Sequence, residues 1–255
     1  MEPLSSVNNA MRILRELMNE GNELGIKELG LRLGLAKSTV YRLVRTLCLQ
    51  QFVQQNQMTE KYYLGISSFE LGFAAYHTMD IREIAFPLLS KLMNSLRKEV
   101  KLGVFSLGGV IYVCSRIPEH LDSNISKTGR RTPAHCTALG KVLLANQKQE
   151  EIEQALVNGL KAYTNKTNTN KDTLFRELAD IRQKGYGFTY EEYIEGRWAV
   201  AVPVYNDSDQ VIAAISLSDN VGLFSQEKKK QYITELQTYS RLITGCYDRR
   251  LASKI

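Results

Sequence analysis

The first fifty residues carry three apolar stripes at helical spacing, and these stripes constrain the fold more than any other feature of the sequence. Apolar side chains between Val7 and Met18 recur every three or four residues, which predicts a first helix with one apolar face. Ser5 or Ser6 is suited to cap its start, and Gly21 is suited to end it. The chain therefore begins with an amphipathic helix.

Two shorter stripes follow, separated by a turn that contains Gly34. The first runs from Ile26 to Leu33, and Gly34 can end it because glycine readily adopts the positive φ of a tight turn. The second runs from Val40 to Leu47 and predicts another helix. Two helices joined by such a turn are typical of a helix-turn-helix, whose second helix enters the major groove of DNA.

The side of the third helix opposite its apolar stripe carries hydroxyl, aromatic and basic groups. Residues 1–80 contain eight Lys/Arg and eight Asp/Glu, so overall charge is no argument for DNA binding. However, no acidic residue occurs between Glu28 and Glu60, and this stretch can approach phosphates without repulsion. Six side chains are predicted to contact DNA: Lys37, Ser38, Thr39, Tyr41, Arg42 and Arg45.

A β-hairpin is predicted directly after the third helix. Phe52–Gln55 and Lys61–Leu64 have strand-like composition and flank a polar turn at 56–59. This hairpin would make the N-terminal segment a winged helix-turn-helix. Spacing alone leaves one alternative open, in which the helices form an ordinary three-helix bundle with solvated charges.

Residues 80–255 show a different pattern, in which paired strands alternate with groups of helices. Asp80 and Glu83 have capping-box spacing and are expected to open a helix, and Gly108-Gly109 is expected to join two strands. Strands are predicted near 100–107, 110–116, 186–190, 198–205 and 210–218, and helices near 136–146, 149–159, 172–184 and from about 225. This order predicts an antiparallel α+β domain, and the sequence has no Walker or dinucleotide-binding glycine motif.

Composition narrows the class of protein. Apolar residues make up 44% of the chain and charged residues 24%, as in ordinary globular proteins, and no apolar run is long enough to cross a bilayer. The N-terminus lacks an export signal, so a cytoplasmic location is expected. The four cysteines form no CxxC pair, and His135 beside Cys136 has no orienting third group. We therefore expect no metal site, no cofactor and no enzymatic activity.

Motifs along the whole chain resemble the IclR family of transcriptional regulators. In the N-terminal part these are Leu35–Leu43, Tyr62–Gly65 and Ser67–Gly72, the last being similar to the start of that family's linker helix. Ser67 and Glu70 also have capping-box spacing. The C-terminal matches are residues 129–141, 185–187, 191–192, 196, 199–204 and 216–218. The resemblance implies a winged helix-turn-helix at 1–66, a linker helix at 67–79 and a GAF-like effector-binding and oligomerisation domain at 80–255.

The resemblance also implies where a small effector would bind. In IclR-type domains the effector lies between the loop at the start of one helix and the later strands. The matching positions of this chain are Ala138, Leu139, Thr189, Ala199, Ser216 and Ser218. Helix N-terminal N–H groups and serine hydroxyls suit a carboxylate, such as a sugar acid or an aromatic acid. Family members commonly have cysteine at the position of Ala199, so the resemblance leaves the effector's identity open.

The sequence therefore predicts a DNA-binding transcriptional regulator, a repressor of a carbon-source catabolic operon that is controlled by a small metabolite. Its expected partners are double-stranded operator DNA, the small-molecule effector and further copies of the chain, in a homodimer or a dimer of dimers, with no membrane partner. The alternative is a metabolite-binding enzyme or signalling module whose N-terminal helices serve assembly.

Overall fold

A computed structural model describes residues 4–20, 23–119 and 128–252. The chain divides into two compact units, Met1–Thr78 and Met79–Ile255, and each is described by itself. The stop expected at Gly21 lies outside the described residues.

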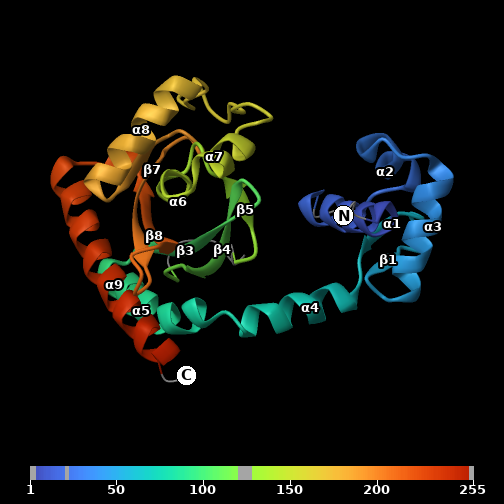
Figure 1. Cartoon of the computed structure of the whole chain (residues 1–255), viewed down its shortest axis with the longest axis horizontal. Helices are drawn as coiled ribbons and strands as arrows, with labels where there is room; N and C mark the ends of the chain where they lie inside the picture. The colour runs from blue at the N-terminus through green and yellow to red at the C-terminus, as the bar shows by residue number, and fades with distance from the viewer. Residues whose placement is uncertain (1–3, 21–22, 120–127, 253–255) are drawn as a thin grey trace. The chain divides into compact units, whose positions relative to one another are not determined.

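The first unit is a winged helix-turn-helix, as expected (Figure 1). Its elements are α1 (Ser5–Glu20), α2 (Ile26–Leu33), α3 (Lys37–Leu49), β1 (Val53–Gln55), β2 (Tyr62–Leu64) and α4 (Ile66–His77). Apolar faces of the first three helices and of the β1-β2 hairpin share one core, which includes Ile13, Leu29 and Val40. Gly34 ends α2 with a φ of 66°, the left-handed conformation that its place in the turn predicts.

Helix α4 begins differently from the sequence prediction. Its N-cap is Gly65, which provides no side-chain cap, so the capping box expected from Ser67 and Glu70 is wrong. Ser68 instead donates a hydrogen bond from its Oγ to the carbonyl oxygen of Phe52. This bond connects the start of α4 to the beginning of the wing. The helix is strongly apolar, yet none of its residues is buried within this one chain.

The second unit is built on one antiparallel sheet of six strands in the order β5-β4-β3-β8-β7-β6. Its strands are β3 (Glu99–Ser106), β4 (Gly109–Arg116), β5 (Arg131–Pro133), β6 (Gly187–Tyr190), β7 (Arg197–Tyr205) and β8 (Val211–Asn220). Its helices are α5 (Asp80–Leu96), α6 (Ala138–Ala145), α7 (Gln149–Ala155), α8 (Lys171–Lys184), the short 3-10 turn η1 (Val221–Leu223) and α9 (Gln226–Ala252). The predicted antiparallel α+β class is confirmed.

The sheet separates two apolar cores. Helices α5 and α9 cover one face, where Leu89 and Leu236 pack with strand residues such as Val200. Helices α6, α7 and α8 lie on the other face, where Val142 packs with Leu178 (Figure 1). Alternate residues of each strand therefore belong to different cores.

Three local expectations in this unit are corrected by the structure. The β3-β4 turn lies at Leu107-Gly108, both with positive φ, and Gly109 already belongs to β4. Strand β5 was not expected. The capping box at the start of α5 is also wrong: Met79 is the N-cap, and Asp80 and Glu83 pair with Arg250 of α9 at 2.9 and 2.6 Å.

Asp219 of β8 is an ionisable residue on the face of the sheet that α9 covers, and its contribution to stability can be tested. Although burial raises its pKa, hydrogen bonds from Lys98, the Asn220 N–H and Tyr232 outweigh this and hold the pKa below its usual value. Because the pKa of Asp219 is lower in the folded than in the unfolded chain, its ionised carboxylate stabilises the fold. This stabilisation is complete above the unfolded pKa of about 4 and is lost as the pH falls through the folded pKa.

We therefore expect Asp219→Asn to lower the free energy of unfolding by about 1–3 kcal/mol at neutral pH and by less in acid. Urea unfolding of both proteins at neutral and acidic pH measures the difference. A difference that does not change with pH would show that the charge of Asp219 is not involved.

Candidate DNA-binding and ligand-binding sites

The side chains predicted to contact DNA all lie on the exposed side of α3. They are Lys37, Ser38, Thr39, Tyr41, Arg42 and Arg45. Val40 and Val44 point the other way and are buried in the core of the first unit. Ser38, Arg42 and Arg45 follow at intervals of four and three residues, so they form one exposed row on a helix without acidic residues. The structure brings them together, and their contact with DNA stays a prediction.

The turn of the wing is held by Glu23, which precedes α2. Its carboxylate accepts hydrogen bonds from Asn56 Nδ2 and Thr59 Oγ1, both at 2.5 Å. The bonds from Thr59 and Asn56 hold the pKa of Glu23 below its usual value, so the carboxylate is ionised at neutral pH. Met58 at the tip is almost fully exposed. The turn of the wing is therefore held against the segment that precedes α2.

A cavity of about 330 Å³ lies in the second unit between the sheet and the start of α6. All six positions that the family resemblance assigned to the effector line this cavity: Ala138, Leu139, Thr189, Ala199, Ser216 and Ser218. The structure thus brings together residues that lie up to 80 positions apart in the sequence. That they bind an effector stays a prediction.

Strand register explains why the sheet residues meet here. Ala199 of β7 pairs with Thr189 of β6 and with Ser218 of β8, and Ser218 also pairs with Glu99 of β3. Directly paired residues lie on the same face of an antiparallel sheet, so these side chains form one row across four strands. Ser216 lies two residues before Ser218 and shares that face.

The close approach of α6 to the sheet depends on two glycines. A Cβ atom at Gly187 would lie 2.9 Å from the carbonyl oxygen of Ala138, too close for a side chain. Gly140 faces equally tight surroundings, and its N–H donates to the capping Oγ1 of Thr137 at 3.1 Å. These contacts place Ala138 and Leu139 at the cavity.

Three charged side chains that the sequence analysis missed also line the cavity. Glu99 and Lys101 are buried, and Arg197 is partly exposed. Glu99 Oε2 lies 2.7 Å from Lys101 Nζ and 3.5 Å from Arg197 Nη2. Ser218 Oγ donates to the same carboxylate at 3.2 Å and accepts from Arg197 at 3.1 Å. The hydroxyl of Ser218 therefore already has two partners in the protein.

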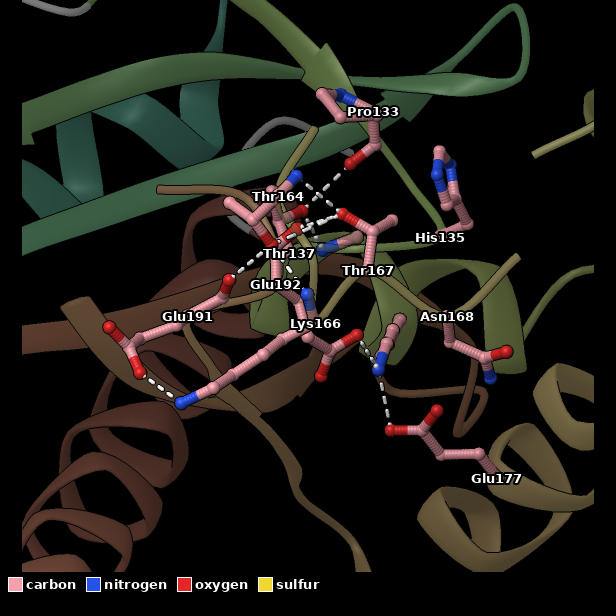
Figure 2. Close-up of polar contacts among 12 residues, drawn as sticks. Pro133, His135, Thr137, Thr164, Lys166, Thr167, Asn168, Glu177, Glu191 and Glu192 are labelled. Atoms are coloured by element: carbon pink, nitrogen blue, oxygen red, sulfur yellow. Dashed lines mark hydrogen bonds and ion pairs between the residues drawn. The ribbon is translucent and has the colours of Figure 1, made fainter. Parts of the chain in front are cut away.

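Two loops form another part of the cavity wall and are tied together (Figure 2). The hydroxyls of Thr164 and Thr167 donate to the main-chain carbonyls of Glu191 and Glu192, each at 2.6 Å. These bonds run from side chains of one loop to the backbone of the other. The two loops are thereby held side by side at the cavity.

Lys141 of α6 is a fully buried cation behind this wall. Its Nζ lies 2.6 Å from Glu177 Oε1 of α8 and 2.6 Å from Glu192 Oε2, two carboxylates that Figure 2 shows converging from separate elements. Burial raises the pKa of Glu192, and Lys141 opposes that rise. One buried ammonium thus joins α6, α8 and a cavity loop.

His135 and Cys136 lie near the cavity but lack the features of a catalytic pair. Burial raises the pKa of the Cys136 thiol to about 12, so the thiolate is negligible at neutral pH. The ring of His135 contacts the carbonyl oxygen of Lys161 at 3.0 Å, and burial lowers its pKa. In the parts of the chain that the structure describes, no three His, Cys, Asp or Glu residues cluster to hold a metal.

Comparison with known protein families accounts for both units. The IclR helix-turn-helix domain matches residues 6–57, and the bacterial transcriptional regulator IclR C-terminal domain matches residues 73–244. The chain belongs to the IclR family of transcriptional regulators. The second match covers more than half of the chain and includes all the cavity-lining positions.

Individual IclR-family proteins are similar over almost the full length. The HTH-type transcriptional regulator KdgR of Escherichia coli is 34% identical over 245 residues, which cover 96% of this chain and 93% of KdgR. The regulator XynR of Escherichia coli is 34% identical over 225 residues, covering 86% of this chain and 87% of XynR. A crystal structure of an IclR regulator from Alicyclobacillus acidocaldarius has a TM-score of 0.81 and 27% identity, covering 96% and 99%.

The boundaries of the family matches do not decide whether residues 67–79 form a separate linker helix. The C-terminal family match begins at residue 73, inside α4, whereas the two compact units divide after Thr78. A division at 1–66, 67–79 and 80–255 therefore remains a proposal. No helix among residues 4–20, 23–119 and 128–252 is long and apolar enough to cross a membrane.

Proposed function

We propose that this IclR-family regulator represses a catabolic operon by binding operator DNA through α3, and that a small carboxylate in the cavity changes its affinity for the operator. The observation that carries this proposal is the combination, in one chain, of an exposed basic helix in a helix-turn-helix and a cavity lined by hydroxyl and charged side chains in a second unit. We also propose a cytoplasmic location, because such a regulator acts on DNA in the cytoplasm.

The DNA-binding half rests on the geometry of the first unit. Helix-turn-helix proteins place the N-terminal residues of the second helix against base edges, and here Ser38 and Thr39 occupy that end of α3. Arg42 and Arg45 follow on the exposed side, where guanidinium groups can reach phosphates or guanine.

The sensing half rests on the lining of the cavity. Hydroxyl groups and cations surround it, and such groups bind the oxygens of a sugar acid or another small acid. The ligand must favour one conformation of the regulator over another, because equal affinity for both would leave DNA binding unchanged. Couplings of this kind are typically about 1–3 kcal/mol.

A salt titration of DNA binding tests the proposed function. We expect the affinity of the full chain for an operator fragment, measured by fluorescence anisotropy, to fall steeply as salt is raised, because phosphate contacts release counterions. An assembly module without a DNA site would show no binding to titrate. That outcome would favour the alternative, a metabolite-binding enzyme or signalling module.

We also propose that the regulator is a homodimer or a dimer of dimers, with α4 as one interface. Phe69 and Phe73 stack with ring centroids 5.6 Å apart, and both are more than half exposed in the single chain, as is Ile66. These residues lie at intervals of three and four and form one apolar stripe, which a second copy can cover. Two recognition helices would then reach half-sites about 34 Å apart.

Phe73→Ser is accordingly expected to shift the protein toward smaller oligomers by removing apolar area from this stripe. Sedimentation velocity of the variant and the wild type at matched concentrations measures the change, and circular dichroism confirms that the helices remain. An unchanged sedimentation coefficient would place the interface elsewhere.

The proposal includes no catalytic step. A thiol nucleophile requires an accessible thiolate and an adjacent base, and the raised pKa of Cys136 opposes the first requirement. His135 turns its Nε2 toward the carbonyl of Lys161. Neither group is therefore assigned to catalysis.

A further inference from the structure

The end of α2 is held by an arginine of α1. Arg12 donates one hydrogen bond from Nη2 to the main-chain carbonyl oxygen of Leu33 at 2.8 Å, and another from Nη1 to Asn9 Oδ1 at 3.0 Å. Leu33 is the last residue of α2, where carbonyl groups have no partner within the helix. The guanidinium therefore binds a terminal carbonyl, and its positive charge faces the negative end of the helix dipole.

Asn9 orients this guanidinium. Asn9 and Arg12 are three residues apart on α1, so their side chains are neighbours on the surface of the helix. A guanidinium carries its donors in a rigid plane, so a bond from one donor to Asn9 sets the direction of the others. Both residues are partly exposed and neither belongs to the apolar core of the first unit. They form a polar contact between α1 and α2 in addition to that core.

The start of α2 is held separately from its end. The N–H of Gly25 donates to Glu28 Oε2 at 2.6 Å, and Nζ of Lys61 in the wing lies 3.4 Å from the same oxygen. At the other end of the helix, Arg12 provides the connection to α1. Helix α2 is thus held at both ends by polar contacts with different neighbours.

The recognition helix α3 has no side-chain cap at its start. Its N-cap is Ala36, whose methyl group cannot bind the free N–H groups of the first turn. In the second unit, by contrast, the side chains of Thr137 and Asn170 cap α6 and α8. The placement of Ser38 and Thr39 therefore depends on the turn that precedes α3.

That turn is closely packed against the end of α2. The N–H of Leu35 donates to the carbonyl oxygen of Gly30 at 3.0 Å, and a Cβ atom at Gly30 would lie 3.0 Å from the carbonyl oxygen of Leu35. Gly34 has the positive φ that closes the turn, and Leu35 and Ala36 then lead directly into α3. A displacement of the chain at Leu33 would accordingly displace the first turn of α3.

We propose that Arg12 is a positioning residue for operator recognition, which holds the last turn of α2 on α1 and thereby places the N-terminal residues of α3 for contact with base edges. The inference rests on the proposed function, in which α3 enters the major groove. Arg12 acts through the main chain and is not assigned a contact with DNA. Without its guanidinium, fewer molecules have the binding geometry, and the apparent affinity falls by that fraction.

Arg12→Met in the full chain tests this inference, because methionine is unbranched and apolar and removes only the guanidinium contacts. The probe is a DNA duplex that the wild-type chain selects from a random pool, and the comparison is an unrelated duplex of the same length. We expect the affinity for the selected duplex, measured by fluorescence anisotropy, to fall roughly 3- to 30-fold, as for the loss of a hydrogen bond from a charged donor. Affinity for the unrelated duplex should change less than about two-fold, because it rests on phosphate contacts.

The salt dependence distinguishes positioning from a direct contact. Loss of a phosphate contact would weaken both duplexes alike and would reduce the slope of the salt dependence by about one. That result would make Arg12 a contact to the DNA backbone and would overturn the inference. Arg15→Met, at an exposed arginine three residues further along α1, is the matched control and should bind like wild type.

Amide hydrogen exchange tests the turn without DNA. The N–H of Leu35 reports on the turn through its bond to Gly30, so it should exchange faster in Arg12→Met, while the amides of the wing hairpin should not change. Unchanged exchange at Leu35 would show that Arg12 does not hold the turn, even if DNA binding were weaker.

Two milder variants keep the test valid if Arg12→Met folds poorly. Arg12→Lys keeps one charged donor and should restore part of the affinity for the selected duplex. Asn9→Ala leaves the guanidinium in place without its orienting partner, so it should cause a smaller loss and should add nothing to the loss in Arg12→Met. Fully additive losses would contradict the role of Asn9 and Arg12 as one unit.

Failure of the proposed function would give a different result. If the wild-type chain selected no duplex from the random pool, DNA recognition by α3 would itself be refuted. If the wild-type chain selected a duplex and Arg12→Met bound it with equal affinity, the proposed function would stand and only the role of Arg12 would be refuted.

Discussion

Lys141→Met is expected to lower the free energy of unfolding by about 3–5 kcal/mol, because it leaves buried carboxylate charge without its cation. Lys141 is 1% exposed and its ammonium lies 2.6 Å from both Glu177 and Glu192. Methionine has a similar length and is apolar, so the change removes the charge while nearly keeping the volume. Chemical denaturation followed by circular dichroism measures the loss.

The pH dependence of this loss identifies its cause. Burial already raises the pKa of Glu192, and removing Lys141 removes the group that opposes the rise. A carboxyl whose folded pKa is raised costs stability when it is ionised, so the deficit of Lys141→Met should shrink as the pH falls through the raised folded pKa of Glu192.

Lys184→Met is the matched control for this prediction. Lys184 pairs with Asp180 at 2.5 Å within α8, but both side chains are about half exposed. Such a pair contributes only about 0.3–0.5 kcal/mol. Equal losses for the two methionine variants would contradict the role of burial at Lys141.

Arg42→Ala is expected to weaken operator binding by roughly 10- to 100-fold, which corresponds to about 1–3 kcal/mol for a contact with a base. Arg42 is exposed on α3 and lies between Ser38 and Arg45 in the exposed row. The loss of a phosphate contact would instead weaken all DNA sequences alike and reduce the slope of the salt dependence by about one. Anisotropy titrations with operator and unrelated DNA separate the two cases.

Arg176→Ala, which removes an exposed guanidinium from the second unit, should leave operator affinity unchanged. Thermal unfolding of Arg42→Ala should match wild type, since the side chain is not part of the core. Wild-type affinity in the Arg42 variant would remove this residue from the DNA interface.

Local patterns in the sequence predicted the elements well where one face of each element is buried. The apolar stripes of α1, α2 and α3 correspond to the shared core of the first unit, and Gly34 has the positive φ that its position suggested. The capping box predicted at α5 failed because tertiary contacts engage the same side chains, whereas the one predicted at α4 failed because the N-cap is Gly65 and not Ser67. Asp80 and Glu83 pair with Arg250, a partner 167 or more residues away that no local pattern reveals.

The candidate ligand site was likewise predicted only in part. Its neutral positions were expected because they lie within motifs of the IclR family or, for Thr189, between two of them, and the structure gathers them around one cavity. Glu99 and Lys101 were missed because they alternate with Val100 and Leu102, a pattern equally typical of a strand with one face in solvent. Only the packing of α6 against β3 in the folded unit shows that the polar face of this strand is covered.

The bonds between the two cavity loops leave part of the cavity lining free to vary. Thr164 and Thr167 donate to main-chain carbonyls, and a carbonyl is present whatever side chain the acceptor residue carries. Ile194, which follows these acceptors and lines the cavity, can therefore be exchanged without breaking these bonds, whereas Tyr193 packs against Tyr163 of the other loop with ring centroids 5.0 Å apart. A substitution at Ile194 would change the lining of the cavity while the hydrogen bonds that pair the two loops are retained.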